Sequence, residues 1–117
     1  MGREMASVER TLVKSPPELW ELLDDRELMR RWTAELERSA DPPAVEVTAR
    51  TPGERLAWRS TGRGAEAEVE LVLAEKGWGT NVSIRAEGED GERAVEAVLD
   101  RLLDELSSPQ RRPFTRA

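Results

Sequence analysis

The sequence predicts one small α+β domain in which a long C-terminal helix lies across the apolar face of an antiparallel sheet. In residues 65–73 the apolar Ala65, Ala67, Val69, Leu71 and Leu73 alternate with Glu66, Glu68 and Glu70, which is typical of a strand with one buried and one solvated face. Residues 92–106 carry one apolar stripe at helical spacing, formed by Val95, Val98, Leu99, Leu102, Leu103 and Leu106. A single helical stripe and a single apolar sheet face must cover each other, which predicts this fold class.

Length and composition limit the number of domains and the kinds of partner and catalytic group that are expected. The 117 residues fit one domain, expected over 1–106 with a mobile tail over 107–117. The net charge of −6 disfavours nucleic acid as a partner. The chain has no Cys, His or Tyr, which excludes disulfides, a thiol nucleophile and a serine–histidine pair. We expect no catalytic residue, no metal site and no cofactor, and a cytoplasmic protein without a membrane span.

The N-terminal part predicts a strand followed by a helix. The strand covers Met5–Val13, where alternate positions are apolar except Arg10. Ser15 and Glu18 flank two prolines in a capping box, so a helix is expected to begin at Pro16 and to end at Leu23.

A second signal for the start of a helix follows the first helix almost without a linker. Asp24 and Glu27 predict a second short helix over Asp25–Trp32, with its apolar residues towards the core. We expect a further short strand over Thr33–Arg38 and a turn over 40–43.

The middle of the chain predicts four strands separated by turns. In the first of them, Val45, Val47 and Ala49 are expected on one face and Glu46, Thr48 and Arg50 on the other. The four strands cover residues 45–50, 55–60, 65–73 and 81–87, and turns are expected over 51–54, 61–64, 75–79 and 88–91.

Four segments resemble the SRPBCC superfamily, which includes START-like and polyketide cyclase/dehydrase-like proteins. Leu12–Trp20 (LVKSPPELW) is similar to the start of its first helix, and Asp24–Trp32 (DDRELMRRW) to its second helix with a closing Trp. Pro52–Arg59 (PGERLAWR) and the Gly79-Thr80 pair are similar to the starts of two of its strands. The resemblance covers about residues 8–106.

This resemblance implies a helix-grip fold, an antiparallel sheet wrapped around the C-terminal helix, with an apolar ligand cavity between them. The candidate lining residues are Arg10, Trp32, Trp58, Val69, Leu71, Val82, Leu99 and Leu102. Only a dozen residues separate Trp32 from Val45, where the family has room for an extra strand or hairpin. The chain is therefore a shortened member, for which a small pocket or none is expected.

Each candidate also has a purely structural explanation. The apolar ones also fit simple core packing, and Trp58 fits either role because its N–H needs a partner. Arg10 would bind a ligand carboxylate, or else be structural, emerging at the sheet edge through strand twist or pairing with an acidic residue of a helix. Trp78 lies in a glycine-flanked turn and is expected to be exposed as a cover or a contact point.

Two groups of acidic residues are predicted to be structural. The row Glu66, Glu68 and Glu70 is expected on the solvated face of its strand, where the carboxylates do not converge. The pair Asp24-Asp25 fits helix capping.

Three functions remain open at this stage. The favoured one is a domain that binds a small apolar or amphipathic ligand between sheet and helix. The alternatives are a cyclase/dehydratase-type enzyme, which needs an acid and a base in the cavity, and a protein-interaction domain with a filled cavity, similar to co-chaperone or ribosome-associated members. A homodimer through an edge strand or the helix also stays open.

Overall fold

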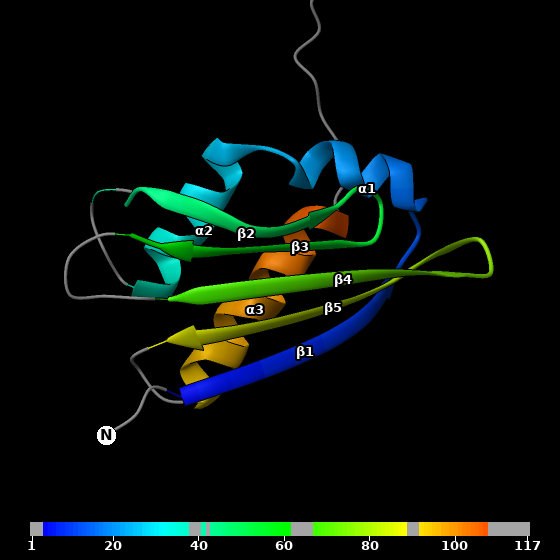
Figure 1. Ribbon diagram of the computed structural model, residues 1–117. Coiled ribbons are helices and arrows are strands. Elements are labelled where there is room, and N and C mark those ends of the chain that lie inside the picture. The colour runs from blue at the N-terminus through cyan, green and yellow to red at the C-terminus, as the bar shows by residue number, and fades with distance from the viewer. Residues whose placement is uncertain (1–3, 38–40, 42, 62–66, 89–91, 108–117) are drawn as a thin grey trace, which may run out of the picture.

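The computed structural model describes residues 4–37, 41, 43–61, 67–88 and 92–107, and Figure 1 shows their arrangement. Within these ranges an antiparallel five-stranded sheet has the strand order β1-β5-β4-β3-β2. The strands are β1 (Glu4–Leu12), β2 (Val45–Thr51), β3 (Arg55–Ser60), β4 (Glu68–Lys76) and β5 (Gly79–Gly88). The helices are α1 (Pro16–Leu23), α2 (Arg26–Glu37) and α3 (Glu92–Ser107).

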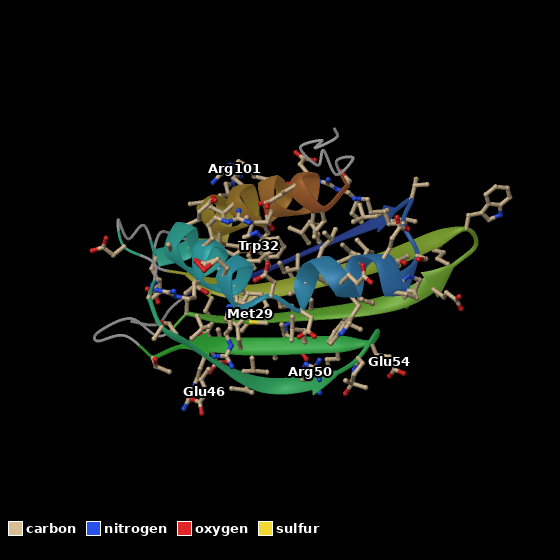
Figure 2. The ribbon with its side chains drawn as sticks, turned by 90° about the horizontal axis from the view of Figure 1, so that it is seen from above. Met29, Trp32, Glu46, Arg50, Glu54 and Arg101 are labelled. Carbon is tan, nitrogen blue, oxygen red and sulfur yellow. The ribbon has the colours of Figure 1, made fainter. Side chains whose placement is uncertain are left out.

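All three helices lie on one face of the sheet (Figure 2), and α3 packs chiefly against β1 and β5. The stripe predicted for α3 is buried there except at Val98, which is half-buried. It meets the inward residues of β4 and β5, among them Leu71, Val82 and Ile84, which have no exposed surface. The predicted α+β architecture, with a C-terminal helix packed on an antiparallel sheet, is confirmed.

The capping signals act as predicted at the start of α1. The Ser15 hydroxyl accepts a hydrogen bond from the Glu18 backbone N–H, and the Glu18 carboxylate accepts one from the Ser15 N–H. At the start of α2, the Asp25 carboxylate accepts a bond from the Glu27 N–H at 3.0 Å. These bonds satisfy backbone donors that have no partner within a helix, so two helices begin within ten residues of each other.

The strand predicted over Thr33–Arg38 is wrong, because α2 continues as a helix to Glu37. Leu36 lies one turn after Trp32 and is buried beside it, so the apolar face of the helix extends by one turn. The Thr33 hydroxyl donates to the Met29 carbonyl at 2.7 Å, a bond that only helical spacing allows.

A bulge in β2 corrects the predicted alternation of that strand. The register shifts between Val47 and Ala49, so that Ala49 pairs with Ala57 on the outer face and Arg50 pairs with the buried Leu56. Two successive residues thus oppose one, and every later side chain changes face. Ala49 therefore lies on the outer face, and Arg50 reaches towards the helices.

The turn between β4 and β5 consists of Gly77 and Trp78, because Lys76 already pairs with Gly79. Gly77 has a φ of +59°, which residues other than glycine adopt only at a cost. Several predictions lie wholly or partly outside the described residues: the turns over 40–43, 61–64 and 88–91, the strand start at Ala65-Glu66, and the tail beyond Ser107. No helix in the described ranges is long and apolar enough to cross a membrane.

Candidate functional site

Side chains of the sheet and of α3 form a buried apolar core between them. Seven of the eight predicted cavity residues are at most 2% exposed and belong to one core cluster: Trp32, Trp58, Val69, Leu71, Val82, Leu99 and Leu102. The rings of Trp32 and Trp58 lie 6.3 Å apart between centroids, tilted by 48°. These residues contact one another as a core does, and their role as ligand contacts stays a prediction.

Both buried indoles find their hydrogen-bond partners within the protein. The Trp58 Nε1–H donates to the Thr33 hydroxyl at 2.8 Å, and the Trp32 Nε1–H donates to Glu105 at 3.2 Å. The polar group of Trp58, which the sequence left open between core and pocket, is therefore satisfied by α2.

Arg10 pairs with acidic residues of α3, one of the two roles expected for it. Its guanidinium donates to Asp104 at 2.6 Å and to Asp100 at 3.1 Å, and also to the Asp100 carbonyl at 3.3 Å. The hydrogen bond with Asp104 is the main reason why the pKa of Arg10 is raised. Arg10 thus fastens the edge strand β1 to α3, and its side chain remains about one third exposed.

A cleft of about 320 Å³ lies between α2 and α3. Figure 2 shows the two helices beside each other, with Arg101 on α3 and with Met29 and Trp32 on α2. Buried Leu36 and Val95 form part of its wall, together with three small apolar residues of α3. The lining consists of Glu35, Leu36, Ala94, Val95, Ala97, Val98 and Arg101.

An ion pair crosses the rim of this cleft. Arg101 Nη2 donates to Glu35 Oε1, and the two side chains are 59% and 33% exposed. Within the described part of the chain this is the only hydrogen bond of the Arg101 side chain. The cleft therefore combines an apolar wall with one cation and one anion at its opening.

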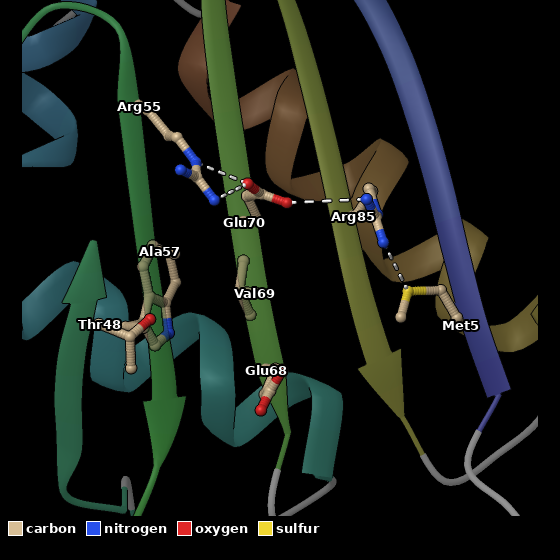
Figure 3. A pocket seen from close by; sticks show the side chains of 9 residues that line it. Met5, Thr48, Arg55, Ala57, Glu68, Val69, Glu70 and Arg85 are labelled. Carbon is tan, nitrogen blue, oxygen red and sulfur yellow. Dashed lines mark hydrogen bonds and ion pairs between the residues drawn. The ribbon is translucent and has the colours of Figure 1, made fainter. Parts of the chain in front are cut away.

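Two further hollows are more strongly charged. The hollow on the outer face of the sheet has about 180 Å³ (Figure 3), and there Arg55 and Arg85 both pair with Glu70, at 2.6 and 3.8 Å. The hollow beside α1 has about 220 Å³ and contains the bidentate pair of Arg31 with Glu105. Of these three hollows, the cleft between α2 and α3 has the most apolar lining.

This cleft was not predicted from the sequence. None of the eight candidates lines it, while Trp58 and Val69 contact the hollow on the outer face. Two signals pointed to the cleft: Leu36 continues the spacing of Leu28 and Trp32, and Ala94, Ala97 and Arg101 recur on one face of α3.

The same fold occurs in solved structures of low sequence identity. DR_A0006 from Deinococcus radiodurans is 22% identical over 88% of this chain and 96% of its own, with a TM-score of 0.61. CalU16 from Micromonospora echinospora is 18% identical over 91% and 81%, with a TM-score of 0.61. The Aha1 dimer from Colwellia psychrerythraea is 16% identical over 88% and 91%, with a TM-score of 0.63.

These likenesses define the class of the chain as a small α+β domain of this shared fold. They are consistent with the resemblance to the SRPBCC superfamily. No protein-family model and no curated protein sequence matches the chain.

Proposed function

We propose that the chain is a helix-grip, START-like domain that binds a small amphipathic ligand in the cleft between α2 and α3. The observation that carries the proposal is the composition of this cleft, an apolar wall under a charged rim. Its volume of about 320 Å³ is at the lower end of the range of small-molecule sites.

The cleft borders directly on the core of the domain. Leu36 and Val95 belong both to the cleft and to the core cluster, so a ligand would lie directly on the packed interior. The extra turn of α2 supplies Glu35 and Leu36 to one side of the cleft. In this proposal the seven buried candidates belong to the core on which the cleft lies.

The test begins with purified full-length protein, incubated with a metabolite and lipid extract and analysed by native mass spectrometry. Backbone amide shifts of Ala94, Ala97 and Val98 should change on addition of the ligand that is found. Ala97→Phe should block binding because it fills the cleft, whereas Ala74→Phe, at an exposed position of β4, should not. Absence of any bound species, or shifts confined to other surfaces, would contradict the proposal.

A second candidate function is protein interaction, favoured by the apolar tip that consists of Trp78 and Val13. These side chains are 92% and 87% exposed. Val13 lies beside Gly79, the residue after Trp78, because a Cβ at Gly79 would be 3.4 Å from the Val13 Cα. A large exposed aromatic side chain on a tight turn is suited to insertion into an apolar pocket of a partner. Affinity capture compared between wild type and Trp78→Ser tests this function: a partner lost only in the variant supports it, and identical captures contradict it.

The cyclase/dehydratase alternative lacks an observation in its favour. In the described lining of the cleft the ionisable side chains are Glu35 and Arg101, and these are bonded to each other. A convergent acid and base facing free space is therefore not formed by the described residues of the cleft.

A further inference from the structure

We infer that the ligand of this cleft is an amphipathic carboxylate, whose carboxylate accepts hydrogen bonds from Arg101 while its apolar chain lies along Ala94, Ala97 and Val98. The inference rests on the proposed function and adds the chemical class of the ligand. It is carried by the free hydrogen-bonding capacity of Arg101 at the rim.

Arg101 differs from the other arginines that line the three hollows. Arg31 uses two nitrogens for Glu105, Arg55 uses two for Glu70, and Arg85 uses one for Glu70 and another for the sulfur of Met5. Arg101 uses only Nη2, for Glu35. A guanidinium has five N–H donors in a planar fork, so one edge of Arg101 remains for a second carboxylate.

The apolar rest of the lining favours a ligand whose hydrocarbon part carries a charge at one end only. Arg101 lies one and two helical turns after Val98 and Ala94, on the same side of α3. A ligand that places its carboxylate at Arg101 can therefore extend its apolar part over these small side chains towards Leu36. Its charged end stays at the solvated rim, where an ion needs little desolvation.

Glu35 affects how strongly the cleft favours a carboxylate over an amine. Its carboxylate holds Arg101 across the cleft, but its negative charge opposes a second carboxylate nearby. Glu35 also lies close enough to Arg31 to raise the pKa of that guanidinium, so a cationic ligand would compete with two arginines for it. Arg101 at the rim would also repel a cation and attract an anion, which favours a carboxylate over an amine.

The test uses three probes of equal chain length, octanoate, 1-octanol and octylamine, titrated into the full chain by calorimetry and NMR. Wild type should bind octanoate roughly tenfold more tightly than octanol, the contribution of one charge-assisted hydrogen bond. Arg101→Gln should abolish this difference, and Glu35→Gln should raise the affinity for octanoate. Arg93→Gln, an equal charge change at an exposed site outside the described cleft, should leave all affinities unchanged.

The outcomes separate the two proposals. Equal binding of octanoate and octanol with shifts at Ala94 and Ala97, unchanged in Arg101→Gln, would overturn the carboxylate preference and leave the cleft as a binding site. Absence of binding by all three probes would contradict the cleft itself. Thermal melts followed by circular dichroism check that each variant is folded, and Glu35→Gln provides an independent reading because it should gain affinity.

Discussion

The hydroxyl of Thr33 connects two other groups in the core, the Trp58 indole and the Met29 carbonyl. It accepts a hydrogen bond from the Trp58 indole at 2.8 Å and donates one to the Met29 carbonyl at 2.7 Å. Thr33 has no exposed surface and Trp58 is 1% exposed, so water cannot replace these bonds. A buried donor without a partner costs more than its hydrogen bond contributes.

We therefore expect Thr33→Val, which keeps the shape and removes the hydroxyl, to lower the free energy of unfolding by about 1–3 kcal/mol. Urea denaturation followed by circular dichroism measures the change. Thr48→Val, at an exposed position of β2, should stay within about 0.5 kcal/mol. In the double variant with Trp58→Phe, the loss should be smaller than the sum of the two single losses, because both partners are then absent. Strict additivity would show that the bond is not formed.

A second contact at the scale of residues joins the edge strand to the helices. Arg50 donates from Nη2 to Asp24 at 2.6 Å and from Nε at 3.1 Å, and its guanidinium lies 5.5 Å from the ring centroid of Trp20. The hydrogen bond from Arg50 holds the pKa of Asp24 below its usual value, and burial opposes this effect. A carboxyl with a lowered pKa in the folded state stabilises the fold above its unfolded pKa.

This contact predicts a stability difference that depends on pH. Asp24→Asn should be less stable than wild type at neutral pH, and the difference should disappear as the pH falls from about 4 through the lower folded pKa. The free energy of unfolding, measured in urea at several pH values, gives the comparison. Glu54→Gln removes an exposed carboxylate of the adjacent turn and serves as the control. A difference for Asp24→Asn that is as large in acid as at neutral pH would contradict the prediction.

At the scale of elements, the turn between β4 and β5 and the first residue of β5 both require glycine. A Cβ at Gly79 would lie 2.0 Å from the backbone oxygen of Leu12, in the neighbouring strand β1. At Gly77 there is open space, and only the positive φ of 59° disfavours a side chain. The two glycines on either side of Trp78 are thus required for different reasons, close contact with β1 at Gly79 and backbone conformation at Gly77.

We expect Gly79→Ala to destabilise the domain more than Gly77→Ala. The first must move β1 away from β5, at a cost of at least about 1–3 kcal/mol for overpacking. The second costs about 1–2 kcal/mol for a left-handed residue with a side chain. Unfolding in urea ranks the two, and amide shifts of Leu12 and Thr80 should change only in Gly79→Ala. The opposite ranking would contradict the close approach of the two strands.

The elements also show how far the sequence could predict the fold. The capping box and the stripe of α3 depend on neighbours in the chain, so their positions were predictable to within a residue or two. The last turn of α2 was assigned to a strand because Thr33-Ala34-Glu35 is locally ambiguous, although Leu36 continues the helical spacing of Leu28 and Trp32 and is buried against the core. The bulge in β2 has no signal in its own residues, since it depends on pairing with β3.

On the scale of the whole molecule, the cleft could not be predicted because it belongs to no single element. Its walls come from the last turns of α2 and the first turns of α3, which are more than fifty residues apart in sequence. The resemblance led to the prediction of an interior site. The side chains that face inward are the same ones whether they pack as a core or line a cavity. Whether such residues meet each other or enclose space depends on the distance between helix and sheet, and a hydrophobic pattern carries no information on that distance.

On the scale of the molecule, the exposed apolar residues in the described ranges favour a monomer. The apolar tip, Trp78 with Val13, is small beside the roughly 800 Å² that each partner contributes to a stable interface. The net charge of −6 adds repulsion between copies. Sedimentation analysis at micromolar concentration should therefore give one species of monomer mass at low and at high salt, unchanged in Trp78→Ser. A dimer in wild type that Trp78→Ser dissociates would show instead that the tip binds a second copy of the chain. The apolar tip would then be a contact between copies, and the cleft between α2 and α3, formed by other residues, would remain open for a ligand in that dimer.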